Sequence, residues 1–247
     1  RSWRRDIYPR YKNNRDVKKA LMTPSEQENA KIHYEAFDGL IEFLKTKTNT
    51  TFLQVQGAEG DDFIARWIDR HPNDQHVILS SDTDFVQLVK HNVQVYDGMK
   101  DLLISENEVS DVKGNKYEFN ITSSGKIKIG KKLKLNESFE PQKDWVGYAL
   151  FLKCIRGDAG DGVFSAYPRA NIRRLNAAWD DRKVKGYDWN NLMLQRWVDE
   201  EKNERLVKDE YEMNVKLIDL SQQPDYVIQL LDDAIDEQIN KPRVAGV

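Results

Sequence analysis

The chain has 247 residues, with 38 Lys or Arg against 41 Asp or Glu and a net charge of −3. This length can bury a hydrophobic core as one large or two small domains, and the single cysteine, Cys154, excludes a disulfide framework and a cysteine-based zinc site. No apolar run approaches the roughly 18 residues that cross a bilayer, so we expect a cytoplasmic protein.

The first twenty residues are strongly basic, with eight Lys or Arg against two Asp. Aromatic residues alternate with the cations in "RSWRRDIYPRYKNNR". Cations neutralise phosphates and aromatic faces stack on unpaired bases, so this pattern is typical of nucleic-acid binding. We therefore expect a segment that becomes ordered mainly against a partner. A solvated charged face with core aromatics is the alternative.

The next element is a helix that begins at Thr23 and runs to about Lys45. Thr23 is suited to the N-cap, Pro24 to the first helical position and Glu26 to a capping box. Apolar residues then recur at helical spacing, which predicts a buried face made of Phe37, Leu40, Ile41 and Leu44.

Strands are expected to alternate with short helices from residue 51 onward. "TFLQVQG", "HVILSS" and "VQVYDG" read as strands, and "DDFIARWIDRH" and "DFVQLVK" read as helices. This order predicts an α/β fold with a mostly parallel central sheet flanked by helices. Between residues 102 and 135, "KYEFNI" and "GKIKIGKKLKL" alternate as β-ribbons do, and the chain is helical again from about Lys143. We expect an α/β part over residues 1–140 and a helical part over residues 141–247.

Three acidic motifs follow predicted elements: "EGDD", "SSDTDF" and "RGDAGDG". Each motif alone is more often a turn or a helix cap. Two of them follow strands of one predicted sheet, where ligands collect in α/β folds. Converging carboxylates repel each other, and hard divalent cations, which take oxygen ligands, would resolve that repulsion. The candidate metal ligands are Glu59, Asp61, Asp62, Asp82, Asp84, Asp158 and Asp161.

"SWRRDIYPRYKNNR", "EGDDFIA", "SSDTDF" and "GDAGDG", in this order, resemble the 5′ nuclease (flap endonuclease) superfamily, and within it the ribonuclease H branch of T-even phages. The resemblance covers most of the chain except residues 100 to 140. It implies a PIN-like nuclease core with a helical DNA-binding part and a 5′ to 3′ exonuclease and flap endonuclease that removes RNA primers and 5′ flaps during replication.

The resemblance also assigns roles to residues. The seven acids would hold two Mg²⁺ ions, with Mn²⁺ as a possible substitute, for two-metal phosphodiester hydrolysis. Arg4 and Lys12 would contact the scissile phosphate, Tyr11 would stack on a base, and Arg15 would contact a further phosphate. Further candidate nucleic-acid contacts are Arg5, Arg10, Lys126, Lys128, Arg169, Arg173 and Arg174. A single-strand-binding protein and a sliding clamp are the implied protein partners, and we expect a monomer.

The chain departs from the family pattern in three places. The family begins with two strands that each end in an aspartate ligand, whereas this sequence begins at Arg1, so we expect those strands to lie in an unseen stretch or a second chain. After "GDAGDG" comes "VFSAYPRANIRRL", which lacks the glycine pattern of a K⁺-binding helix-hairpin-helix. K⁺ binding is therefore doubtful. The lysine-rich ribbon over residues 126–134 is longer than the family leads us to expect, and a solvated ribbon is weighed against duplex binding.

Two rival functions stay open from the sequence. One is a non-catalytic nucleic-acid-binding accessory protein in which the acids are structural. The other is a haloacid-dehalogenase-type phosphatase, because Asp82 and Asp84 form an Asp-x-Asp motif. That family places the motif after its first strand and requires downstream motifs that are not evident here.

Overall fold

Residues 2–242 are described by a computed structural model, and they contribute to two units. The first unit comprises Arg1–Trp67, Gly160–Gly162 and Gln223–Val247, and the second comprises Ile68–Ala159 and Val163–Gln222. These units do not follow the division at residue 140 that we expected, and that division stays a prediction. None of the helices within residues 2–242 has the length and apolar character needed to cross a membrane.

The first unit is helical. It contains α1 (Arg4–Ile7), α2 (Asn13–Ala20), α3 (Pro24–Lys47), most of α4 (Gly60–Arg70) and α9 (Asp225–Ile239). Its core is formed by side chains of α4 and α9 and by Trp3, with Phe63, Val227, Leu231 and Ile235 buried together. Arg66 of α4 also pairs with Asp232 of α9 at 2.6 Å. The N-terminal segment is therefore ordered against its own unit through Trp3, although we expected it to need a partner.

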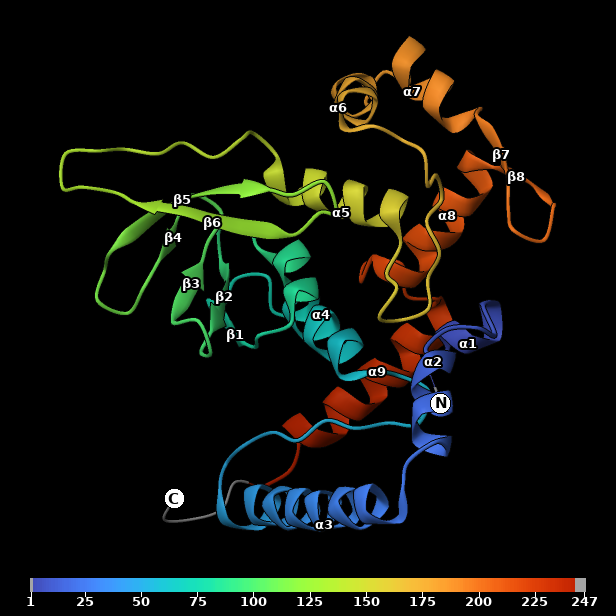
Figure 1. Cartoon of the computed structure of the whole chain (residues 1–247). Coiled ribbons are helices and arrows are strands. Elements are labelled where there is room, and N and C mark those ends of the chain that lie inside the picture. The colour runs from blue at the N-terminus through green and yellow to red at the C-terminus, as the bar shows by residue number, and fades with distance from the viewer. Residues whose placement is uncertain (1, 243–247) are drawn as a thin grey trace. The chain divides into compact units, whose positions relative to one another are not determined.

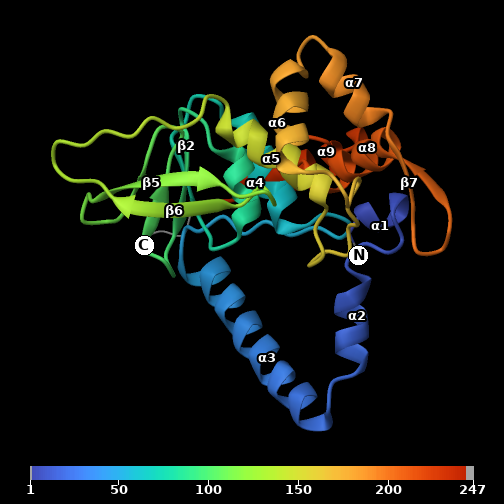
Figure 2. The ribbon, with the colours of Figure 1, turned by 45° about the horizontal axis from the view of Figure 1, so that its top comes forward.

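The long helix α3 begins where the sequence predicts. The Thr23 side chain accepts a hydrogen bond from the Glu26 amide, and the Glu26 carboxylate accepts one from the Thr23 amide, which confirms the capping box. Figure 2 shows α2 and α3 diverging from the short turn that joins them. The prediction of a buried face is wrong, because no residue of α3 is buried and Phe37 is 57% exposed.

The second unit contains a six-stranded sheet in the order β1-β2-β3-β4-β5-β6, coloured from teal to green in Figure 1. The strands are β1 (His76–Leu79), β2 (Val93–Asp97), β3 (Leu102–Ile104), β4 (Val109–Ser110), β5 (Lys116–Ile121) and β6 (Ile127–Lys132). Only β1 and β2 are parallel, and every later neighbour is antiparallel. The α/β class is confirmed, but the mostly parallel sheet is a wrong prediction. Connections of a few residues can join only antiparallel neighbours, and the longer link through η1 (Thr83–Leu88) allows the one parallel pair.

The sequence predicted a strand at "TFLQVQG", and this prediction is wrong: the stretch is not a strand. Its apolar residues Leu53 and Val55 pack instead against the core of the first unit. A strand needs a hydrogen-bonding neighbour, and none of the strands in the described part of the chain pairs with this segment.

Helices complete the second unit. They are α5 (Trp145–Arg156), α6 (Ile172–Asp181), α7 (Tyr187–Met193) and α8 (Val207–Ile218), with a small hairpin of β7 (Arg196–Val198) and β8 (Glu204–Leu206). The apolar side chains of α5 form the centre of this core: Leu152 and Ile155 are fully buried. Trp145 at the start of α5 packs edge-on against Phe119 of β5, with ring centroids 5.0 Å apart. Helix α5 also contacts η1, so the predicted acids Asp84 and Asp158 are attached to neighbouring elements.

Candidate active site

Glu59, Asp61 and Asp62 form an acidic group at the start of α4. One carboxylate oxygen from each lies within 4.8 Å of the others. The position favours acids, because the free amide groups of a helix N-terminus carry partial positive charge. The Asp62 carboxylate accepts a hydrogen bond from the Glu59 amide at 2.9 Å, so the helix start itself fixes this arrangement.

Asp62 is fully buried and both of its oxygens are occupied. Oδ1 accepts from the Arg4 guanidinium at 2.8 Å, and Oδ2 accepts from Arg4 at 3.1 Å and from the Trp3 indole at 3.2 Å. Arg4 is itself only 1% exposed. A bidentate pair of this kind is strongly oriented. The structure therefore places both residues in a buried pair, and their predicted roles as a phosphate contact and a metal ligand stay predictions.

Glu59 receives cations from the basic N-terminal segment. Lys12 Nζ lies 2.5 Å from one oxygen, and Arg4 lies 3.1 Å from the other. The Tyr11 hydroxyl donates a further hydrogen bond at 3.0 Å. Burial by itself would raise the pKa of Glu59, but Lys12 and Arg4 outweigh burial and lower it. Glu59 is thus charged and already compensated.

Asp161 is contacted by the same segment. Arg15 reaches one oxygen at 2.6 Å, and Lys12 and the Tyr11 hydroxyl lie 3.6 Å and 3.2 Å from the other. The Lys12 amide also donates to the Asp161 carbonyl at 2.7 Å. Because the Tyr11 ring is only 2% exposed, it offers no free face to a base in this arrangement. A stacking role for Tyr11 stays a prediction.

Asp61 differs from its neighbours because no cation pairs with it within residues 2–242. Its carboxylate accepts the Asp62 amide at 3.0 Å. Burial, together with the charges of Asp62 and Glu59, raises its pKa to about 6 despite Arg4 and Lys12 nearby. The group is therefore short of positive charge at Asp61. An all-oxygen donor set with uncompensated negative charge fits a hard divalent cation.

The second unit carries the other three predicted ligands. Asp82 is exposed and caps η1, where its Oδ1 accepts from the Asp84 amide at 2.9 Å. Asp84 pairs with Lys153 of α5, and Asp158 lies 3.1 Å from the same Lys153 nitrogen. Burial raises the pKa of Asp84 although Lys153 lowers it. Asp82 thus forms the cap that one alternative for Asp-x-Asp predicts, and Asp84 pairs with a lysine; their roles as metal ligands stay predictions.

The structure assigns the seven acids to two groups. Glu59, Asp61, Asp62 and Asp161 belong to the first unit, and Asp82, Asp84 and Asp158 belong to the second. Each group is well defined within its own unit, and a single seven-carboxylate site stays a prediction. Sequence reasoning missed Lys153. Its signal is a lysine in a mostly apolar helix, five residues before Asp158.

The candidate nucleic-acid contacts differ in availability. Arg5 pairs with Asp16 at 2.6 Å, and Arg174 bonds to the Asn191 side chain at 2.9 Å, so both already have structural partners. The remaining cations of the prediction are exposed at the surface: Arg10, Lys126, Lys128, Arg169 and Arg173. Exposure suits a phosphate contact but does not establish one.

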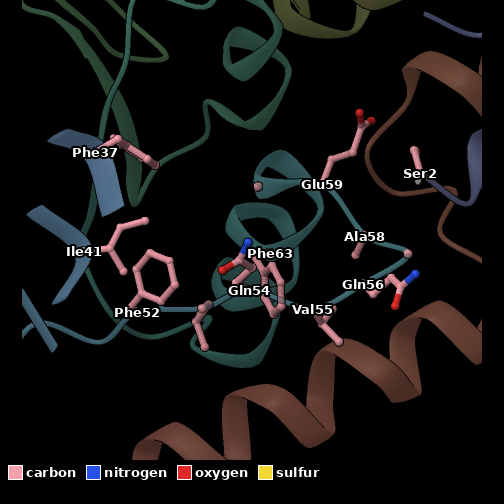
Figure 3. A pocket seen from close by; sticks show the side chains of 13 residues that line it. Ser2, Phe37, Ile41, Phe52, Gln54, Val55, Gln56, Ala58, Glu59 and Phe63 are labelled. Carbon is pink, nitrogen blue, oxygen red and sulfur yellow. The ribbon is translucent and has the colours of Figure 1, made fainter. Parts of the chain in front are cut away.

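A pocket of about 820 Å³ lies beside the acidic group in the first unit. Figure 3 shows that its apolar side chains come from α3, from the segment before α4 and from α4 itself, including Phe37, Ile41, Phe52 and Phe63. The Glu59 carboxylate points away from these rings. The pocket thus has an apolar wall on α3 and an acidic edge at the start of α4.

The sequence of the chain is similar to a known protein family and to several known proteins. Residues 1–115 match the model of the 5′–3′ exonuclease N-terminal, resolvase-like domain. DNA polymerase I of Rhizobium leguminosarum is 32% identical over 103 residues, which are 41% of this chain and 9% of the polymerase. Flap endonuclease Xni of Psychromonas ingrahamii is 30% identical over 115 residues, which are 46% of this chain and 39% of Xni. The chain thus spans well under half the length of these curated relatives.

The fold as a whole is similar to the D15 protein of bacteriophage T5, crystallised with metal ions. The TM-score is 0.63 at 18% identity, covering 96% of this chain and 80% of the phage protein. Another structure of that flap endonuclease, with a TM-score of 0.60, is a complex with DNA and metal ions. Residues 1–115 thus match the N-terminal domain of 5′–3′ exonucleases, and these findings support the resemblance to the 5′ nuclease superfamily seen in the motifs.

Proposed function

We propose that this protein is a metal-dependent, structure-specific 5′ nuclease that hydrolyses phosphodiester bonds as a 5′ to 3′ exonuclease and flap endonuclease. The observation that carries the proposal is the meeting of Glu59, Asp61 and Asp161 with Lys12 and Arg15 in the first unit. Oxygen ligands for a cation lie beside cations that suit a phosphate. The match of residues 1–115 to the 5′–3′ exonuclease N-terminal domain supports the same activity.

The metal in this proposal is Mg²⁺, as two ions, with Mn²⁺ as a substitute. Glu59, Asp61, Asp62 and Asp161 would hold metal in the first unit, and Asp82, Asp84 and Asp158 would do so in the second. Bound divalent cations supply an activated water and stabilise the leaving oxygen in such hydrolysis. Asp61 supports this assignment, because burial and the charges of Asp62 and Glu59 raise its pKa, and a bound divalent cation would offset both effects.

The protein's own residues bind and orient the substrate. The Arg15 side chain is 60% exposed and that of Lys12 is 16% exposed, and both contact Asp161. In the proposed complex they contact the phosphates at the cleavage site and neutralise charge there. The buried Arg4 side chain supports this arrangement, because it holds Asp62 and Glu59 in place.

The proposed substrates are DNA and RNA–DNA with a 5′ flap or a single-stranded 5′ end, as in ribonuclease H-type removal of replication primers. The T5 flap endonuclease complex with DNA supports a DNA substrate. We further propose a monomer that acts in the cytoplasm, of the host cell if the gene is phage-borne, with a single-strand-binding protein and a sliding clamp as partners. The buried free thiol of Cys154 is compatible with a reducing compartment.

The test is cleavage of a 5′-labelled flap DNA with Mg²⁺ or with EDTA. We expect cleavage near the flap junction only with Mg²⁺, and a loss of about 10- to 100-fold or more in Asp61→Asn, as for groups that support a metal site. Asp69→Asn, an exposed acid later on α4, is the matched control and should keep full activity. Tight flap binding without metal-dependent cleavage would instead identify a non-catalytic accessory protein.

A further inference from the structure

Lys153 of the second unit contacts two predicted metal ligands. Its ammonium pairs with Asp84 of η1 and lies 3.1 Å from Asp158, which follows α5. The Lys153 side chain is 14% exposed, and each carboxylate is 26% exposed. The three groups are thus half-buried, where charges are screened less than at the surface.

The backbone around Lys153 is held firmly. Its neighbours in α5, Leu152 and Cys154, are buried in the core. On the other side the turn at Gly125 packs against α5 so closely that a Cβ there would lie 2.9 Å from the Lys153 amide nitrogen. The ammonium is therefore directed by a helix that has little freedom to move.

The two carboxylates are fixed independently of Lys153. The Asp84 amide is held by the Asp82 cap. Asp158 exchanges two backbone hydrogen bonds with Val163, at 2.9 Å and 2.8 Å, and the preceding Gly157 has a φ of 73°, which only glycine adopts readily. The carboxylates would consequently remain near one another if the lysine were absent.

A lysine ammonium and a divalent cation suit the same place between two carboxylates. Both are compact cations attracted by the same oxygens, and they repel each other. We propose that Lys153 is a resident counter-ion of the second unit that competes with a divalent cation for Asp84 and Asp158, and so sets how tightly that cation binds. This rests on the metal-dependent function proposed above. Lys153 is a positioning residue: without metal it neutralises the two carboxylates, and it weakens metal binding.

The state of Lys153 agrees with this role. An ordinary lysine is charged near neutral pH, and two carboxylates contact this one. A neutral lysine would leave the carboxylates uncompensated and would not oppose a metal.

The test is a titration of the full chain with Mn²⁺, followed by electron paramagnetic resonance, and with Mg²⁺, followed by calorimetry. The metal-binding sites that Asp84→Asn weakens are those that depend on the second unit. In Lys153→Met these sites should bind the divalent cation about tenfold more tightly, a change that corresponds to about 1.4 kcal/mol. Lys153→Arg, which keeps the charge, should bind as the unaltered chain does. Asp84→Asn/Lys153→Met should lose most of the gain.

A merely structural lysine predicts the opposite sign, because its removal would disorder the carboxylates and weaken binding. Unchanged or weaker binding in Lys153→Met therefore overturns the proposal. If Lys153→Met does not fold without metal, Lys153→Gln, which keeps a polar end without charge, should show the same tightening. Divalent binding by the unaltered chain with no tightening defeats this inference alone. No divalent binding by any form defeats it together with the proposed metal-dependent function.

Discussion

Asp61 and Asp62 are identical residues one position apart, yet their surroundings are opposite. Asp62 is fully buried and satisfied by Arg4, Trp3 and the Glu59 amide. Asp61 accepts one backbone amide, and burial raises its pKa to about 6. The sequence motif marks both as acids of one site, but it carries no information on which acid is compensated. That distinction depends on Arg4, 58 residues away from Asp62 along the chain.

We expect the two aspartates to respond oppositely to the same substitution. Asp62→Asn removes the bidentate carboxylate that pairs with the buried Arg4 guanidinium, and should lower the free energy of unfolding by about 3 kcal/mol. Asp61→Asn removes an uncompensated charge, and should raise it by about 1 to 3 kcal/mol at pH 8. Urea unfolding of both variants in EDTA measures this. Equal destabilisation would show that Asp61 is compensated as Asp62 is.

The increase in the free energy of unfolding that we expect for Asp61→Asn should depend on pH. Because the folded-state pKa of Asp61 is raised from 3.8 to about 6, the folded protein holds this proton more tightly than the unfolded chain does. The charge therefore costs stability fully above about pH 6, and the cost disappears as the pH falls toward about 4. The stability difference between Asp61→Asn and the unaltered chain should shrink over that window, and a constant difference would contradict the assignment.

Helix α3 shows what a sequence pattern can and cannot predict about an element. The capping box and Pro24 are local signals, since their partners lie within one turn, and the predicted start is confirmed. The apolar positions predicted a buried face, yet Phe37, Leu40 and Phe43 are each at least half exposed. Periodicity shows which side of a helix is apolar, but whether other residues cover that side depends on long-range packing. The strand predicted at "TFLQVQG" failed for the same reason, since pairing is not a local property.

Because α3 is exposed, we expect a destabilising change in it to affect this helix and not the core, and Thr23→Ala tests this. Loss of the N-cap should cost about 1 kcal/mol in the helix. Since no residue of α3 is buried, the loss should appear as faster amide exchange in the first turns of α3, with little change in the core around Leu231 and Ile235. Thr46→Ala, at an exposed threonine in the last turns of α3, is the control. Equal loss of protection in the core would mean that α3 is coupled to it.

At the scale of the whole molecule, the motifs predicted the superfamily and the metal-type acids, while the compact units cut across the predicted division. The chain leaves the first unit after Trp67, returns for Gly160–Gly162 and returns again after Gln222. Such returns are set by side chains that meet only in the folded protein, as Asp161 meets Lys12 and Arg15. The effect of a lysine's charge also depends on the fold, because the fold decides whether an acidic side chain lies beside it.

The lysine ribbon over residues 126–134 allows lysines with and without acidic partners to be compared for their effect on DNA binding. Lys126 and Lys128 are exposed on β6 or just before it, whereas Lys131 lies 3.5 Å from both Glu118 and Glu137. Each lysine that neutralises a duplex phosphate contributes about 0.9 to the slope of log affinity against log salt. Lys126→Gln/Lys128→Gln should therefore reduce that slope by about 1.8 for a flap duplex bound in EDTA. Lys131→Gln should hardly change it, because its charge already belongs to two glutamates. Equal effects of both would mean that duplex DNA draws Lys131 away from its carboxylates, and no effect of either would assign the ribbon to solvent.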